Sequence, residues 1–340
     1  MIYKNRLIFL FSVIAFLALT YAASFIFSPE NMNTKSSLYT WLDPKMEGKI
    51  NRIVISKGDT NLLMKEYPDM FDIGIEEILS SLDIELIKKG NKWFVFNNGR
   101  EYPARQHRIE DFIKIFSKSS PWPVRSTNAS SHARFGLDGS MSSRITVYSE
   151  NAVLMDILLG NEDNGGKEIF MRRYGENEVR SGDSIASSYL SNSISSWYEL
   201  RLFPETENGL LDVSSVQRIS VYRENETLIF SRQNREWIAS GFGLVSPGQA
   251  QIENYIHAVL NAEGDDFISY VNTNDPALDY NSIIIEFGDG SVKTIRISAP
   301  NETNTRIANV RNAGNSEYIY SIPLWTAVRI LKDASSFEMQ

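Results

Sequence analysis

The residues able to do acid–base or metal chemistry are few and lie far apart along the chain. The three histidines, His107, His132 and His257, form no His-Glu-x-x-His pattern, and there is no cysteine. Histidine and cysteine are common zinc ligands, and the cysteine thiolate is a common nucleophile. We expect His107 and His257 to be solvated helix residues and His132 to lie in a Ser/Asn-rich loop. The sequence therefore predicts no catalytic residue and no metal ligand.

Nucleotide and serine-hydrolase motifs are also missing from the sequence. Neither G-x-x-x-x-G-K-[ST] nor G-x-S-x-G occurs. The first of these patterns cradles phosphates and the second exposes a nucleophilic serine. The tripeptides Gly241-Phe242-Gly243 and Gly288-Asp289-Gly290 each contain two glycines but lack the third glycine of a dinucleotide site. We expect both to be turns. We predict no cofactor, and any energy must come from a partner.

Carboxylate pairs are the remaining source of hydrolytic chemistry. They occur at Glu110-Asp111, Glu162-Asp163 and Asp265-Asp266. A glycosidase needs two carboxylates that face each other, whereas adjacent residues of a helix point about 100° apart. We expect Glu110-Asp111 to be a solvated helix face. Residues 161–166 have the composition of a calcium loop, but Arg172 stands where the bidentate Glu belongs, so a hairpin loop is predicted.

One tryptophan is a candidate for partner binding. Trp122 lies between Pro121 and Pro123, which exclude it from a regular helix or a central strand. A stiffened tryptophan can anchor an interface, and these three residues are the candidate partner interface. The alternative is that Trp122 closes the end of a domain core.

The N-terminus carries the clearest physical signal. Residues Leu7 to Phe27 include no charge, and 21 residues of helix suffice to cross a bilayer. Lys4 and Arg6 precede the run, which predicts a single-pass anchor with the N-terminus in the cytoplasm and the rest outside. The alternative is a cleaved signal peptide with Thr20-Tyr21-Ala22 at its end. We expect an anchor over 1–28 and a membrane-proximal linker over 29–50, with Trp41 at its base.

Beyond the linker the chain alternates strand and helix patterns in two similar halves, 51–204 and 213–337. Each half is expected to hold a strand, a tryptophan-containing strand, and a helix with apolar residues at i, i+3, i+4 and i+7. The tryptophan and the first helical isoleucine are Trp93 and Ile109 in one half and Trp237 and Ile252 in the other. A further helix is expected at about 70–82. The sequence thus predicts an α+β protein of mostly antiparallel strands with an internal repeat.

Each half should end in a hairpin pair and a second amphipathic helix. The second hairpin turns at Asp289-Gly290, a dipeptide suited to a tight turn. The apolar faces of the second helices are expected at Leu190, Ile194, Trp197 and Tyr198 in the first half and at Leu324, Val328 and Leu331 in the second half. The tryptophans on these apolar faces, Trp93, Trp197, Trp237 and Trp325, are expected in the core.

Charge argues against a nucleic-acid partner. The chain has 34 Lys and Arg against 42 Asp and Glu, for a net charge of −8. Binding to phosphate backbones needs a basic footprint.

The segments KWFVF, YPARQHRIEDFIKIF, RFGLD, ITVYSENAVLMDILLG and EIFMRRYGENEV follow one another behind the apolar N-terminus. In this order the chain resembles the bacterial proteins grouped as domain of unknown function 4340, from about Arg52 to Leu331. The resemblance implies an extracytoplasmic protein encoded beside ABC-type export systems of the gliding-motility kind, and it implies no catalytic residue.

The expected function is that of a non-enzymatic, membrane-tethered accessory subunit or scaffold at the bacterial cytoplasmic membrane. Its expected partner is a membrane protein such as an ABC permease. Two alternatives stay open: a membrane-tethered hydrolase of envelope glycans, and a ligand-binding sensor. The oligomeric state is open as well.

Overall fold

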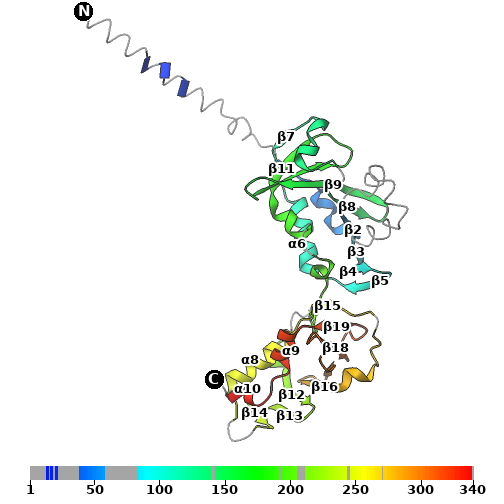
Figure 1. Ribbon diagram of the computed structural model, residues 1–340, viewed down its shortest axis with the longest axis vertical. Coiled ribbons are helices and arrows are strands. Elements are labelled where there is room, and N and C mark those ends of the chain that lie inside the picture. Colours follow the sequence, from blue (N-terminus) through cyan, green and yellow to red (C-terminus); the bar gives the residue numbers. More distant parts are fainter. Residues whose placement is uncertain are drawn as a thin grey trace, which may run out of the picture. The chain divides into compact units, whose positions relative to one another are not determined.

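The computed structural model describes residues 13, 14, 16, 17, 20, 21, 38–57, 83–138, 142–190, 193–204, 211–242, 246–269 and 271–338. The chain divides into two compact units, Met1–Trp197 and Tyr198–Gln340 (Figure 1). The division comes before Pro204, where the sequence-based first half ends. The predicted helix at about 70–82 and most of the run from Leu7 to Phe27 lie outside the described residues.

The first unit is built on an antiparallel sheet. Its described strands are β1 (Leu38–Tyr39), β2 (Arg52–Lys57), β3 (Ile84–Lys89), β4 (Lys92–Asn97), β5 (Arg100–Pro103), β6 (Ser120–Pro121), β7 (Val124–Ser126), β8 (Ser143–Ser149), β9 (Ala152–Glu162), β10 (Glu168–Arg173) and β11 (Val179–Asp183). Its helices and 3₁₀ turns are η1 (Pro44–Lys49), α6 (Gln106–Ser117), η2 (Ala129–Ser131), η3 (Ala133–Phe135), η4 (Ser184–Ala186), α7 (Ser187–Leu190) and η5 (Ile194–Trp197). The described part of the main sheet has nine strands in the order β5-β4-β3-β2-β8-β9-β10-β11-β7.

The second unit repeats this style of construction. Its described strands are β12 (Val216–Arg223), β13 (Glu226–Gln233), β14 (Glu236–Ser240), β15 (Asp266–Phe267), β16 (Asn281–Phe287), β17 (Val292–Ile297), β18 (Arg306–Arg311) and β19 (Ile319–Ile322). Its helices and 3₁₀ turns are η6 (Val213–Ser215), α8 (Gln249–Leu260), η7 (Pro276–Tyr280), α9 (Leu324–Ile330) and α10 (Ser335–Glu338). The described strands form one antiparallel sheet in the order β14-β13-β12-β16-β17-β18-β19-β15. Mixed helices and antiparallel sheets confirm the predicted α+β class.

The two sheets arrange their strands in the same way. In each unit a run of antiparallel strands comes before the long helix, β2 to β5 in the first unit and β12 to β14 in the second. The first strand of each run pairs with the first strand of the main meander that follows the helix, β2 with β8 and β12 with β16. The long helices α6 and α8 bury the predicted positions, beginning with Ile109 and Ile252. Each also begins with a glutamine bound to the backbone of a strand tryptophan, Gln106 to Trp93 and Gln249 to Trp237. Sequence periodicity located these helices correctly because their apolar faces cover the sheets.

The segment expected to be a linker is part of the first unit from Leu38 onward. β1 pairs with β6, Trp41 is 2% exposed, and its ring meets that of Trp122 edge-on at 5.5 Å. Arg173 donates from Nε to the Tyr39 hydroxyl at 2.8 Å and from Nη2 to the Trp41 carbonyl at 2.9 Å. Trp41 therefore belongs to the core of this unit rather than to a separate base.

Helix α9 presents a different face from the one expected. Its buried residues are Thr326, Ala327 and Ile330, while Leu324, Trp325 and Val328 are 53%, 59% and 63% exposed. The prediction that Leu324, Trp325 and Val328 are core residues was wrong. Small residues face the protein, and Thr326 donates a hydrogen bond to the carbonyl of Glu263 at 2.9 Å.

Candidate functional site

The second unit carries an open cavity of about 600 Å³, a size within the usual range of ligand pockets. Its apolar wall comes from α9 and the residue that follows it, with Leu324, Val328 and Leu331. Its polar wall comes from the β12–β13 turn, the junction of η7 and β16, the start of β18, and the segment between α9 and α10. The cavity therefore joins an aliphatic surface to charged groups.

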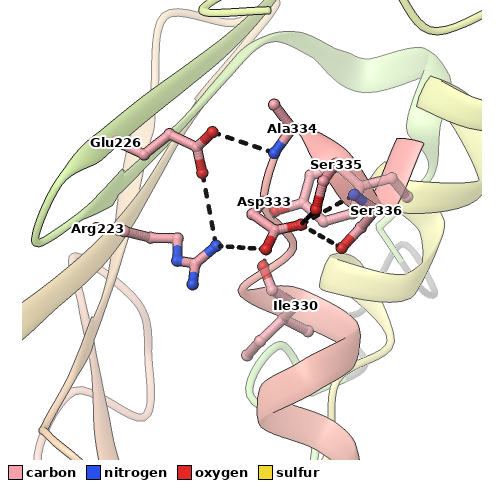
Figure 2. A network of polar contacts seen from close by, with 8 residues as sticks. Arg223, Glu226, Ile330, Asp333, Ala334, Ser335 and Ser336 are labelled. Atoms are coloured by element: carbon pink, nitrogen blue, oxygen red, sulfur yellow. Dashed lines mark hydrogen bonds and ion pairs between the residues drawn. The ribbon is translucent and has the colours of Figure 1, made fainter. Parts of the chain in front are cut away.

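The first group of charged side chains in the cavity comes from the tight turn between β12 and β13. Arg223 and Glu226 face each other in the register of β12 and β13, with only Glu224 and Asn225 between them. Arg223 Nη1 lies 3.5 Å from a carboxylate oxygen of Glu226 and 3.7 Å from one of Asp333 (Figure 2). Because the same guanidinium contacts both carboxylates, it ties the hairpin turn to the segment after α9.

Hydrogen bonds hold Asp333 in its ionised form. Its Oδ1 accepts from the Ser335 hydroxyl at 2.9 Å and from the Ser336 amide and hydroxyl at 2.9 and 2.5 Å (Figure 2). Donation by Ser336 and Ser335 lowers the pKa of Asp333 to about 2. Glu226 in turn accepts from the Ala334 amide at 3.1 Å. Both carboxylates are therefore held in place as hydrogen-bond acceptors.

Tyr280, Glu224 and Arg306 also line the cavity. The Tyr280 hydroxyl donates to Glu224 Oε2, and this bond raises the pKa of Tyr280. Arg306 Nη1 donates to the Ser298 carbonyl at 2.9 Å. Burial lowers the pKa of Arg306, Arg223 adds to that effect, and Tyr280 opposes it. No carboxylate of the described residues lies within ion-pair distance of Arg306.

This arrangement suits binding better than acid catalysis. A glycosidase acid needs a raised pKa, whereas the pKa of Asp333 is lowered. Burial raises the pKa of Asp83 and of Asp266, but neither residue lines the cavity. Within the described ranges no three His, Asp or Glu side chains gather as a metal site.

The candidate partner interface at Trp122 is buried. Trp122 is 2% exposed, Pro121 is exposed and Pro123 is half-buried. Gly182 lies so close that a Cβ there would sit 2.2 Å from the Trp122 ring. Trp122 closes the end of the core of the first unit, which is the alternative that the sequence left open.

The other polar candidates stay apart from the cavity. His107 and His257 are exposed on α6 and α8, and His132 Nε2 lies 3.2 Å from the Asn177 carbonyl. Asp163 accepts from the amides of Lys167 and Glu168, as expected of a hairpin loop between β9 and β10. Glu110 and Asp111 are exposed. These residues behave as the sequence predicts.

The predicted membrane anchor, from Leu7 to Phe27, lies largely outside the described residues. None of the helices in the described part of the chain combines the length and the apolar character that crossing a bilayer requires.

Sequence reasoning missed the cavity itself. Leu324, Val328 and Leu331 were recognised as one apolar face, but that face was assigned to the core. The turn at residues 223–226 follows directly on a predicted strand, and its three charged residues, one Arg and two Glu, would have been the signal for the cavity.

Fold and cavity together define an α+β protein of two antiparallel-sheet units with an open amphiphilic cavity in the second. The family model for a domain of unknown function (DUF4340) matches residues 93–282. This match covers more than half of the chain and spans parts of both units, and the protein belongs to that family. Comparison with curated proteins and with solved structures gives no match.

Proposed function

We propose that the protein is a membrane-tethered, extracytoplasmic binding subunit that works without catalysis as an accessory of an ABC-type export complex. The observation that carries this proposal is the cavity of the second unit. Glu226 and Asp333 are engaged by Arg223 and by backbone or serine donors, so they hold the polar wall of the cavity in place.

The tether is supported by the sequence. The uncharged run from Leu7 to Phe27 follows Lys4 and Arg6, and this order favours an N-terminus in the cytoplasm. The strand β1 of the first unit begins only a short distance later, at Leu38. Such a protein would sit at the outer face of the cytoplasmic membrane.

We further propose that the two units are repeats of one α+β module. They share a strand order, and Gln106 and Gln249 bind the backbones of Trp93 and Trp237 through the same pair of atoms. Duplication of a module enlarges the surface that a scaffold offers to its partners.

Crosslinking in the native membrane tests the accessory role. The full-length tagged protein would be crosslinked briefly, purified in mild detergent, and its partners identified by mass spectrometry. We expect an ABC permease and its ATPase, and we expect both to be lost when Leu7–Phe27 is exchanged for a cleavable signal. The matched control replaces the same run with an unrelated apolar anchor, which should keep the partners if the exported units make the contact.

Recovery of the chain without any transporter subunit would contradict the accessory role. Hydrolysis of envelope glycans by the purified protein would contradict the absence of catalysis, and its loss on Asp333→Asn would locate that activity.

A further inference from the structure

Two charges of opposite sign in the cavity have no ionic partner among the residues that the structure describes. Arg306 donates one hydrogen bond, to the Ser298 carbonyl, and its Nε and Nη2 donate to no described residue. Glu224 is exposed and accepts from the Tyr280 hydroxyl through Oε2, while no described cation lies within ion-pair distance of it. Tyr280 donates its hydroxyl to Glu224, and all three residues line the same cavity. By contrast, Arg223 is shared by Glu226 and Asp333.

Beside these charges lies uncovered apolar surface. Leu324 and Val328 line the cavity and are more than half exposed, and Trp325 extends the same helix surface. The other five tryptophans are at most 4% exposed. Contiguous exposed apolar side chains next to polar groups are typical of binding surfaces.

We infer that the cavity binds the zwitterionic headgroup of a membrane phospholipid, with the acyl chain along α9. Arg306 pairs with the phosphate, since a guanidinium matches phosphate geometry. Glu224 and the ring of Tyr280 take the ammonium group, the first as a counter-ion and the second through a cation–π contact. Leu324 and Val328 cover the start of the chain, and burial of that surface adds affinity.

Charge complementarity selects a zwitterion over a simple ion. A purely anionic ligand would neutralise Arg306 and leave Glu224 without a counter-ion. A purely cationic ligand would leave Arg306 half-buried without one. The inference rests on the proposed function only in placing the second unit within reach of a membrane.

Trp325 supplies a built-in reporter for this binding. The full-length protein in maltoside micelles would be titrated with lysophospholipids that carry one brominated acyl chain and either an ethanolamine or a glycerol headgroup. Bromine quenches tryptophan on contact, so quenching reports a chain lying along α9. We expect the ethanolamine lipid to reach half-quenching at a mole fraction at least about tenfold lower than the glycerol lipid, and Trp325→Phe to remove the signal.

Two variants test the headgroup contacts. Glu224→Gln should abolish the preference for ethanolamine, because it removes the counter-ion of the ammonium group. Arg306→Gln should raise the half-quenching mole fraction of both lipids, since both carry the phosphate, while Arg311→Gln, exposed on the same strand as Arg306, should leave both values unchanged. Glu224 lies in an exposed turn, so Glu224→Gln remains a valid test even if Arg306→Gln fails to fold. Equal quenching by both lipids, or a preference that survives Glu224→Gln, would overturn the inference.

A soluble competitor separates the two sources of a zwitterion. Phosphoethanolamine without an acyl chain should displace the brominated lipid only at a concentration at least about a hundredfold higher, because it lacks the apolar contact. Displacement at a similar concentration would reject a membrane lipid as the ligand. The assay uses no partner protein, so lipid selectivity without recovery of transporter subunits would overturn the accessory role alone.

Discussion

Gln106 binds both polar atoms of the Trp93 backbone, accepting from its amide at 2.9 Å and donating to its carbonyl at 3.1 Å. Gln249 does the same to Trp237, with both distances 2.7 Å. β14 is an edge strand, so Gln249 satisfies two backbone groups that no neighbouring strand would bind. One side chain at the start of each long helix thus fixes the position of that helix on its sheet.

Removing either glutamine should destabilise only its own unit. Gln106→Ala leaves the partly buried Trp93 amide without its partner, while the Trp93 carbonyl keeps the Ala104 amide at 3.1 Å, and we expect a loss of about 1–3 kcal/mol of unfolding free energy in the first unit. Gln249→Ala should do the same in the second unit. Urea unfolding of the full-length protein combined with hydrogen exchange assigns the loss to a unit. Gln233→Ala, at the exposed end of β13, is the control and should change stability by less than about 0.5 kcal/mol.

Gly182 should tolerate no side chain. A Cβ at this position would lie 2.2 Å from the Trp122 ring, and overpacking of this kind costs about 1–3 kcal/mol or more. We expect Gly182→Ala to lower the urea midpoint of the first unit. Gly48→Ala is the matched control, because no atom lies within 4 Å of the added Cβ. Equal midpoints for the two variants would refute the close packing described at Trp122.

Trp122 itself should behave as a core residue and not as an interface anchor. Trp122→Ala removes a large buried side chain, which typically costs about 3–5 kcal/mol. Thermal unfolding of the full-length protein measures this loss. Pro121→Ala, at an exposed neighbour, should have little effect. If Trp122→Ala kept the unfolding temperature but lost the crosslinked partners, Trp122 would instead be an interface residue.

Asp333 should make stability depend on acid pH. Its pKa is about 2 in the folded protein against an ordinary value of 3.8, so the ionised form stabilises the fold above pH 3.8. That stabilisation is lost as the pH falls from about 4 to about 2. Because the side chain is 43% exposed, we expect only about 1 kcal/mol from it.

Urea unfolding of Asp333→Asn and of the unchanged protein between pH 7 and pH 3 measures this effect. The difference in unfolding free energy between the two proteins should be largest at pH 7 and decrease toward pH 3. Glu302→Gln, exposed in a loop, is the control. A difference that is constant with pH would rule out the carboxylate charge as its source.

Trp325 should account for nearly all quenching by acrylamide. It is 59% exposed, whereas the other tryptophans are buried. Trp325→Phe should therefore remove the accessible component of the emission, while Trp93→Phe should leave it. If the accessible component of the emission persists in Trp325→Phe, the exposure of Trp325 on α9 is contradicted.

Sequence patterns predicted the elements whose large apolar residues face the core. Ile109, Phe112 and Phe116 lie at helical spacing and are buried in α6, and Asp289-Gly290 forms the expected turn between β16 and β17. In these elements the largest apolar side chains provide most of the burial, so their period reports the buried face.

The same rule misassigned α9 because small residues make its contacts. Thr326 and Ala327 face the protein and allow close approach, which turns Leu324 and Val328 outward. Leucine is more hydrophobic than alanine and threonine, so a prediction from hydrophobicity alone places the wrong face of α9 against the protein. The cavity was hidden for a further reason: Arg223, Tyr280, Arg306 and Asp333 are distant in sequence, and only the sheet order brings them together.

The contacts of the first unit with Tyr39 and Trp41 determine how the chain would transmit a pulling force. The Arg180 guanidinium lies 4.0 Å from the centre of the Tyr39 ring, and Arg173 binds both Tyr39 and the Trp41 carbonyl. A pulling force applied before Leu38 would reach β10 and β11 through these contacts before it could peel β2 from the sheet. A stretch as long as residues 28–37 extends to at most about 35 Å. A unit tethered this closely to the proposed anchor would be confined to a thin layer above the bilayer. This confinement raises the rate at which it encounters proteins embedded in the membrane.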